Sequence, residues 1–324
     1  MDAAALHDQS VVCDCHCDTL LRVLDGGMHL GKRLTEGHVD LPRLKEGGVT
    51  SQVFAVFIDD RYLPAGAAKQ TLRLIDVLYR ELEDNPETLS LALRAADVEG
   101  AKASGKVAAI LGAEGAEALE GDLALLRSYY RLGLRLLTLT WSRRNQVGDG
   151  VFEARSLGGL TTFGVEVVRE CNRLGILLDV SHLSPAGVSD VLDTSAVPVI
   201  ASHSNAHAVV AHPRNLTDKQ LSTIAVKGGL ICVTFVPQFV AESGHATLEA
   251  VLDHLDHIVR VVGVEHVGLG SDFDGFGPAS TLGLEDVSCL PNVTAGLAAR
   301  GYTDAAVRSI LGTNFLRVFR EAVG

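Results

Sequence analysis

Six residues that could bind a metal ion or transfer a proton stand near the ends of short apolar runs far apart in the chain. They are His16, Asp18, Glu114, His182, His203 and Asp272. In His16-Cys17-Asp18, the alternation of a β-strand would place the histidine and the aspartate on one face and Cys17 on the other. Imidazoles and carboxylates suit Zn²⁺ or a similar divalent ion. This set therefore predicts metal-assisted hydrolysis.

The same residues can be divided between two ions. Glu114 has two carboxylate oxygens and could bridge ions about 3.5 to 4 Å apart, and His182 and His203 would complete the second ion. A water between the ions would become hydroxide near neutral pH, which leaves Asp272 as the proton shuttle. One histidine or aspartate at a strand end is usually an ordinary polar residue or a helix cap. The prediction therefore depends on five strand ends all carrying suitable side chains.

Eight apolar, β-branched runs would position these residues. They cover residues Val11–Asp18, Thr50–Ile58, Val107–Glu114, Leu134–Trp141, Gly175–His182, Pro198–His203, Gly228–Val236 and His266–Asp272. Every gap exceeds the roughly dozen residues that a parallel crossover needs. Eight such strands favour a closed (β/α)8 barrel over the alternative, a doubly wound open sheet. Barrel active sites lie at the carboxyl ends of the strands, where all six residues stand.

Helical patterns separate most of these runs. They cover Ala67–Glu83, Glu117–Arg131, Phe163–Leu174 and Leu248–Val262, and the long segment from Asp59 to Lys106 leaves room for an extra helix. Two further C-terminal patterns, Thr303–Leu311 and Thr313–Ala322, could cap the barrel or pack beside it. No linker or composition break divides the chain, so residues 1–324 are expected to form a single domain. Cys13, Cys15 and Cys17 are expected to be buried core residues in a reducing compartment.

Composition excludes several classes of function. The 28 basic and 40 acidic residues give a net charge of −12, which disfavours binding to nucleic acid. No apolar stretch approaches the roughly 20 residues that span a bilayer, and the first ten residues lack the pattern of a secretory signal. The expectation is a cytoplasmic protein without a membrane segment. No glycine-rich nucleotide fingerprint follows a strand and opens a helix.

Eight short motifs, in order along the chain, resemble the renal (membrane) dipeptidase family of zinc metallopeptidases. They are Asp14-Cys-His-Cys-Asp18, Gly112-Ala-Glu-Gly115, Leu137-Thr-Leu-Thr140, Gly159-Leu-Thr-Thr-Phe-Gly164, Leu178-Asp-Val-Ser-His182, Ser202-His-Ser204, His212-Pro-Arg-Asn215 and Gly270-Ser-Asp-Phe-Asp-Gly275. The resemblance runs from about residue 11 to residue 320. It implies an amidohydrolase-like barrel that binds two Zn²⁺ ions per chain. It also implies that the protein cleaves dipeptides and forms a homodimer.

Carried over by residue, the resemblance implies that His16 and Asp18 bind one zinc and that His182 and His203 bind the other. Glu114 would bridge the two ions, and Asp272 would transfer the proton. Arg214 would hold the substrate carboxylate, because a guanidinium can bind a carboxylate through two parallel hydrogen bonds. The alternative for Arg214 is an exposed loop residue. Asn215 could assist Arg214, or it could cap the helix that starts near Thr217.

One position departs from the family pattern. Well-studied relatives have a histidine after Leu-Thr-Leu-Thr, where it polarises the scissile carbonyl or stabilises the tetrahedral intermediate, but this chain has Trp141. Tryptophan can donate one hydrogen bond but cannot accept a proton or bind zinc. One lost donor to such an intermediate typically costs about 2.7 to 4 kcal/mol, which slows catalysis without abolishing it. Arg143, Arg144 and Asn145 could supply another donor or could be solvated loop residues.

The resemblance further implies tolerance of D-residues on the carboxyl side of the substrate and weak hydrolysis of β-lactams. Two alternative functions stay open at this stage. The first is an amidohydrolase that acts on another small amide, such as an N-acyl amino acid. The second is a non-catalytic relative that retains zinc, which the presence of Trp141 makes conceivable.

Overall fold

A computed structural model describes residues 2–324, apart from the side chain of Ala154. Its centre is a closed barrel of parallel strands in the order β1, β2, β4, β5, β6, β7, β8 and β9, with β9 paired to β1. The strands are β1 (Cys13–Cys17), β2 (Ser51–Phe57), β4 (Val107–Glu114), β5 (Leu134–Thr138), β6 (Leu177–Asp179), β7 (Ile200–Ala201), β8 (Leu230–Val233) and β9 (Val267–Leu269). Each lies within one of the eight apolar runs, so the (β/α)8 barrel is confirmed and the open sheet is excluded.

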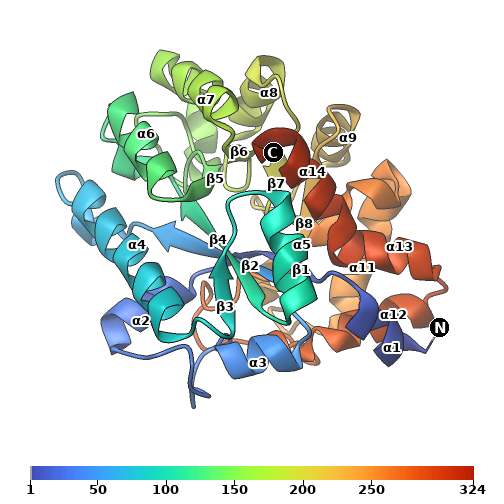
Figure 1. The fold of residues 1–324 in the computed structure, drawn as a ribbon. Coiled ribbons are helices and arrows are strands. Elements are labelled where there is room, and N and C mark those ends of the chain that lie inside the picture. The colour runs from blue at the N-terminus through green and yellow to red at the C-terminus, as the bar shows by residue number, and fades with distance from the viewer. Residues whose placement is uncertain (1) are drawn as a thin grey trace.

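Helices surround the barrel (Figure 1). They are α1 (Ala3–Gln9), α2 (Thr19–Gly26), α3 (Leu41–Glu46), α4 (Ala67–Asp84), α5 (Ala95–Ser104), α6 (Leu123–Arg131), α7 (Thr162–Leu174), α8 (Pro185–Thr194), α9 (Asp218–Val226), α10 (Pro237–Val240), α11 (Leu248–Val262), α12 (Pro291–Ala299), α13 (Asp304–Arg308) and α14 (Asn314–Val323). The extra helix expected between Asp59 and Lys106 is α5. The segment Glu117–Arg131, expected to be one helix, is instead a 3₁₀ turn followed by α6, because Gly121 has a φ of +78° and Asp122 caps α6.

The segment after α4 contains a strand that the sequence did not predict. β3 (Leu89–Leu91) pairs with the first residues of β4, outside the closed ring. Three residues are too few to show the alternation or the apolar run that marks a strand.

An irregularity in β1 brings the first ligand pair to the barrel mouth. Cys13 and Cys15 pack among side chains from the barrel interior, whereas Cys17 packs in the outer core between strands and helices. The register with β2 shifts between Asp14 and Cys17, which indicates a β-bulge. The bulge resets the alternation, so His16 follows Cys15 and still lies on the inner side. All three cysteines are buried and free, as expected.

The amino-terminal end of the barrel is closed by α14. Phe315 and Phe319 stack at 5.3 Å between ring centroids and pack with α5 against interior residues of the strands. In Figure 1, α5 and α14 cross in front of the strands. A π-helical turn, Ser309–Thr313, leads into α14 and brings Gly312 against the start of β1, where a Cβ atom would lie 2.4 Å from the Val11 carbonyl oxygen. The C-terminal segment therefore caps the barrel.

Candidate active site

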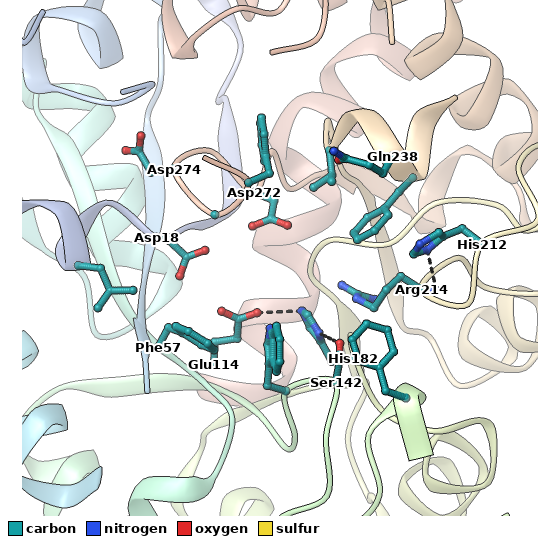
Figure 2. A pocket seen from close by; sticks show the side chains of 17 residues that line it. Asp18, Phe57, Glu114, Ser142, His182, His212, Arg214, Gln238, Asp272 and Asp274 are labelled. Carbon is teal, nitrogen blue, oxygen red and sulfur yellow. Dashed lines mark hydrogen bonds and ion pairs between the residues drawn. The ribbon is translucent and has the colours of Figure 1, made fainter. Parts of the chain in front are cut away.

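A cavity of about 480 Å³ opens at the carboxyl ends of the strands. Figure 2 shows the side chains that line it. The lining includes Asp18, Glu114, His182, Arg214 and Asp272, all of them identified from the sequence. The remaining predicted ligands, His16 and His203, are buried directly beneath them. All six metal-binding or proton-transferring candidates therefore converge, although they come from five strands.

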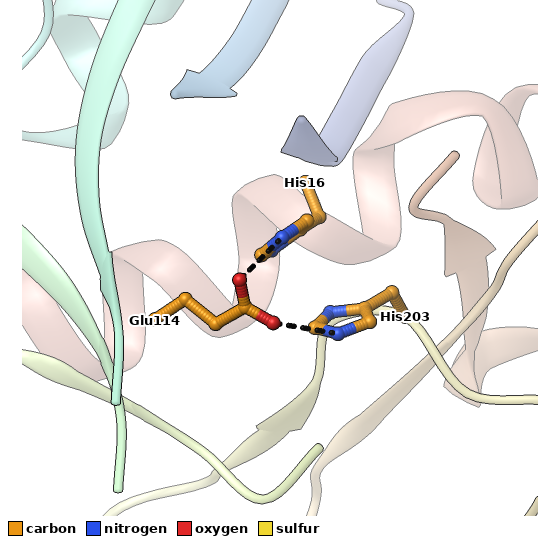
Figure 3. Close-up of side chains that lie close together, drawn as sticks. All are labelled: His16, Glu114 and His203. Atoms are coloured by element: carbon orange, nitrogen blue, oxygen red, sulfur yellow. Dashed lines mark ion pairs between the residues drawn. The ribbon is translucent and has the colours of Figure 1, made fainter. Parts of the chain in front are cut away.

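Glu114 lies at the centre of the cluster and faces a different partner with each oxygen (Figure 3). Its Oε2 is 3.7 Å from His16 Nε2, whereas its Oε1 is 2.8 Å from His182 Nε2 and 3.6 Å from His203 Nε2. The two Nε2 atoms of His182 and His203 are 2.7 Å apart. Two imidazoles and one carboxylate that point their ligating atoms at one another form the geometry that a divalent cation would satisfy.

A second group of ligand atoms surrounds His16. Its Nε2 is 3.5 Å from Asp18 Oδ2 and 3.9 Å from Asp272 Oδ1. Among the described residues, both ring nitrogens of His16 and Oδ1 of Asp18 are buried without a hydrogen-bond partner. Buried polar atoms rarely stay unpaired, because each costs about 1 to 3 kcal/mol. These orphaned atoms fit a metal ion, and His16 belongs to two groups of ligand atoms that could hold one, with Glu114 and His203 and with Asp18 and Asp272.

Burial perturbs the acids and bases of the cluster in opposite directions. It raises the pKa of Asp18 to about 6, with a further contribution from the charge of Glu114. It also raises the pKa of Asp272 well above its ordinary range. Burial lowers the pKa of His182 to about 4, and the charge of Arg214 adds to this effect. A bound cation would favour ionised carboxylates and neutral imidazoles, which are the forms that bind metals.

Hydroxyl groups orient the two histidines that face Glu114 Oε1. Ser142 Oγ is 2.8 Å from His182 Nδ1, and Ser202 Oγ is 2.7 Å from His203 Nδ1. The Ser202 hydroxyl also lies 2.6 Å from Asp179 Oδ2 and donates to it. The Ser202 oxygen therefore accepts a hydrogen bond from the His203 Nδ1–H group, which leaves Nε2 unprotonated and directed at the cluster. Sequence reasoning missed Asp179, although it lies within the motif that ends at His182.

Two of the predicted residues have left-handed backbones. The φ angles are +67° at His182 and +64° at Asp272, and Asp274 follows at +68°. Such conformations cost energy for residues other than glycine and cluster at functional sites. The loop after β9, which carries Asp272, is held in part by the Asp272 amide. This amide donates to the His16 carbonyl oxygen at 3.1 Å.

Arg214 lies in the wall of the cavity rather than on the surface. Its side chain is buried, its guanidinium donates to the His203 carbonyl oxygen at 3.1 Å, and it lies 5.4 Å from the Phe239 ring centroid. Its Nε has no hydrogen-bond partner among the described residues. Burial lowers the pKa of Arg214, although an arginine stays charged at neutral pH. A buried guanidinium without a bound carboxylate is suited to receive one from a ligand.

Of the two other residues expected to contact substrate, Trp141 lines the cavity and Asn215 does not. The Asn215 amide nitrogen donates to the carbonyl oxygens of Val210 and Phe239, both at 2.9 Å, and the residue is not part of the cavity lining. Thr217 is the N-cap of α9, so Asn215 braces a loop instead of capping the helix. A contact between Asn215 and substrate stays a prediction. Trp141 does line the cavity.

Ser142 lines the cavity, but the three polar residues that follow it, Arg143, Arg144 and Asn145, do not. Arg143 forms an ion pair with Asp60, and Arg144 forms one with Asp149. Asn145 donates to the carbonyl oxygen of Leu139 at 2.9 Å. A hydrogen-bond donor that could substitute for the expected histidine is therefore not found among these three residues.

Several lining residues gave no signal in the sequence. Phe57, Phe152, Val236, Gln238, Phe239 and Phe276 contribute to the cavity wall. Phe57 ends β2, Val236, Gln238 and Phe239 belong to the segment of α10, and Phe152 and Phe276 follow β5 and β9. Side chains scattered in this way form no pattern in the sequence, so only the fold identifies them.

The barrel and the ligand-lined mouth define a metal-dependent hydrolase. The sequence profile of the membrane dipeptidase family, peptidase family M19, matches residues 1–323. Dipeptidase tcpJ of Claviceps purpurea is 39% identical over 298 residues, which are 88% of this chain and 69% of that protein. The chain therefore belongs to this family and is a metallopeptidase that cleaves dipeptides.

Solved structures agree with this assignment. A metallopeptidase from Rhodobacter sphaeroides, liganded with a phosphinate mimic of the dipeptide L-Ala-D-Ala, matches with a TM-score of 0.88 and 33% identity over 97% of this chain and 100% of that chain. The dipeptidase AC matches with a TM-score of 0.89 and 36% identity over 97% of this chain and 99% of that chain. Within residues 2–324, no helix is long and apolar enough to cross a membrane.

Proposed function

We propose that this protein hydrolyses dipeptides with two Zn²⁺ ions bound on either side of Glu114. The observation that carries the proposal is the position of the Glu114 carboxylate, whose two oxygens face His16 on one side and His182 and His203 on the other. His16 and Asp18 would hold one ion, and His182 and His203 would hold the other. When bound, such a metal pair polarises the substrate carbonyl and lowers the pKa of a water nucleophile.

Arg214 would bind the terminal carboxylate of the substrate. Its guanidinium is anchored to the carbonyl of His203, a ligand of the cluster, so the carboxylate would be fixed at a set distance from the scissile bond. Such a clamp would favour dipeptides, because a longer chain would carry its terminal carboxylate to a different distance from the scissile bond.

Asp272 would carry the proton. Its Oδ1 lies at the cluster, 3.9 Å from His16 Nε2, and the side chain also lines the cavity. A carboxylate at this position can accept the proton of the attacking water and deliver it to the leaving amine. Its left-handed backbone, with a φ of +64°, is a conformation that costs energy and clusters at functional sites, which supports this role.

The wall of the cavity contains Trp141 at the position where the resemblance led us to expect the histidine of well-studied relatives. The indole ring lies 6.0 Å from the His182 ring and 5.6 Å from the Phe57 ring. Its place in the lining supports a role in excluding water from the metal cluster. The phosphinate mimic of L-Ala-D-Ala bound by the Rhodobacter sphaeroides protein supports acceptance of a D-residue at the carboxyl side.

The test of this function compares dipeptides with N-acyl amino acids and includes Arg214→Gln. The native protein should release amino acids from Leu-Ala and Leu-D-Ala but not from N-acetyl-alanine. In Arg214→Gln, KM should rise at least about thirtyfold, because loss of one partner of a buried charge pair costs about 2 to 5 kcal/mol. Arg173→Gln, which removes an exposed arginine on α7, is the matched control and should retain the native KM.

Other outcomes would identify the alternatives. Faster hydrolysis of N-acyl amino acids than of any dipeptide would favour the amidohydrolase function. Tight zinc binding without hydrolysis of either substrate class would favour a non-catalytic relative.

A further inference from the structure

The direction of a bound dipeptide follows from the strand order, given the proposed role of Arg214. Arg214 belongs to the loop after β7, and four positions around the barrel separate β7 from β2. The end of β2 therefore lies across the mouth from that loop. A dipeptide with its carboxylate at Arg214 and its carbonyl at Glu114 must extend its amino-terminal residue toward β2. In Figure 2, Phe57 and Arg214 lie on opposite sides of Glu114 and His182.

The wall that receives this residue is apolar. Phe57 ends β2, Leu21 comes from α2 after β1, and Phe276 comes from the loop after β9, which is the neighbour of β1. Trp141 packs on Phe57 at 5.6 Å between ring centroids. All four side chains line the cavity, and we call them the apolar wall.

The aromatic members of the apolar wall are held in place by contacts outside the cavity. Phe276 stacks on the His38 ring at 5.0 Å between centroids. The Arg143 guanidinium lies 5.7 Å from the Trp141 ring centroid, and its charge is paired with Asp60. The wall is therefore ordered before substrate binds, and an apolar side chain can enter without reorganising it.

Asp274, two residues before Phe276, is already paired. Asp274 lines the cavity, but its Oδ1 accepts from Arg22 at 2.9 Å and from the His38 amide at 2.8 Å, while Oδ2 accepts from Thr19 at 2.8 Å. The other carboxylates of the lining, Asp18 among them, belong to the metal cluster and the proton-transfer site. The described lining therefore offers no free counter-charge to a charged amino-terminal side chain.

We propose that this site selects dipeptides whose amino-terminal residue carries an apolar side chain, and that Phe57 determines this specificity. The inference rests on the proposed function for the direction of the substrate. Burial of a leucine-sized side chain against the wall should raise kcat/KM about tenfold or more over glycine. A lysine or aspartate side chain would lose hydration there without gaining a partner.

The experiment measures kcat/KM of the zinc-loaded protein for the series Leu-Ala, Phe-Ala, Gly-Ala, Lys-Ala and Asp-Ala. Leu-Ala and Phe-Ala should exceed Lys-Ala and Asp-Ala by about tenfold or more. In Phe57→Lys, the ratio of Asp-Ala to Leu-Ala should rise about tenfold or more, whereas Phe57→Leu should keep the native order of substrates. Each ratio is taken within one protein, so a change in overall activity cancels.

Two results would overturn this inference. The first is a series in which Lys-Ala or Asp-Ala is hydrolysed as fast as Leu-Ala by the native protein, which would leave the dipeptidase function standing. The second is a Phe57→Lys variant whose Asp-Ala to Leu-Ala ratio equals that of Phe57→Leu. Hydrolysis of none of the five dipeptides would contradict the proposed function itself.

Discussion

Among the individual residues of the site, Asp179 and Ser202 lie behind His203 and determine which of its ring nitrogens carries the proton. Asp179 accepts hydrogen bonds from Thr138 and Ser202, both at 2.6 Å, and from the amides of Ser181 and Ser202, both at 2.9 Å. With both of its oxygens occupied, this buried carboxylate forces the Ser202 oxygen to act as an acceptor for His203. The tautomer of His203 is thus set by a residue that never reaches the cavity.

Ser202→Ala should therefore weaken zinc binding while leaving the ligands themselves intact. We expect the affinity for Zn²⁺ to fall about 10- to 100-fold, with activity largely regained at saturating zinc. Competition with a fluorescent chelator measures this affinity. Ser189→Ala is the matched control, because the Ser189 hydroxyl is exposed on α8 and, within the described part of the chain, donates only to the carbonyl oxygen of Pro185. Equal zinc affinities for the two variants would contradict this role for Asp179 and Ser202.

The convergence of the candidate ligands could be predicted from the sequence, because their positions at the ends of apolar runs are the signal. A histidine or carboxylate at the end of an apolar run is conspicuous, and the shared edge of a parallel barrel brings such ends together. Asp179 and Phe57 also stand at the ends of runs. Their roles depend on which side chains the fold places beside them, so no spacing in the sequence reveals those roles.

At the scale of elements, the order and approximate bounds of the barrel strands followed from the apolar runs, but local irregularities did not. The bulge in β1 depends on hydrogen-bond register with β2, which no single segment encodes. The π-helical turn before α14 depends on contact with β1. Such features are decided by tertiary contacts rather than by local preference.

Gly312 tests the close approach between this turn and β1. A Cβ atom there would lie 2.4 Å from the Val11 carbonyl oxygen and 3.0 Å from Cys13 Sγ. Gly312→Ala should lower the free energy of unfolding by about 1 to 3 kcal/mol. Gly100→Ala is the control on α5, where a Cβ atom meets nothing within 4 Å, and should raise it by up to about 1 kcal/mol. Urea unfolding measures both, and equal effects of the two substitutions would show that the turn does not approach β1 this closely.

His254 on α11 links this helix to the loop after β7 and to α10. Its Nδ1 accepts from the Ala206 amide at 3.1 Å, and its Nε2 lies 3.2 Å from the Val240 carbonyl oxygen. Burial lowers the pKa of His254 from 6.5 to about 4. A neutral imidazole is therefore favoured in the folded protein, and its contribution is complete above pH 6.5 and is lost as the pH falls toward 4.

This linkage predicts that up to about 3 kcal/mol of stability depends on His254 across that range. His254→Gln should therefore lose less stability than the native protein between pH 7 and pH 4.5 in urea unfolding with chelator present. His257→Gln is the control, because His257 lies on the same helix but pairs with Asp218 at the surface. If the free energy of unfolding of His254→Gln fell with pH as steeply as that of the native protein, this role for His254 would be contradicted.

In the molecule as a whole, one end of the barrel is closed by apolar packing and the other end carries the candidate active site. Aromatic residues of α14 and interior strand residues fill the amino-terminal end, whereas charged and polar side chains gather at the open carboxyl end. The packed end makes the strands rigid, so the ligands at the other end keep their positions without a metal to organise them. Barrel enzymes typically have this arrangement, with the active site at the carboxyl ends of the strands and stabilising contacts at the opposite end.

The proposed zinc centre around Glu114 is tested most simply by the metal content of protein purified without a metal-affinity tag. Plasma emission should find two zinc ions per chain in the native protein and in Asp272→Asn, which should have lost turnover. Glu114→Gln should retain one ion or none, because neither ion keeps the shared carboxylate. A native protein that binds no zinc after reconstitution, or a Glu114→Gln variant that holds two ions as tightly as the native protein, would contradict a centre built around Glu114.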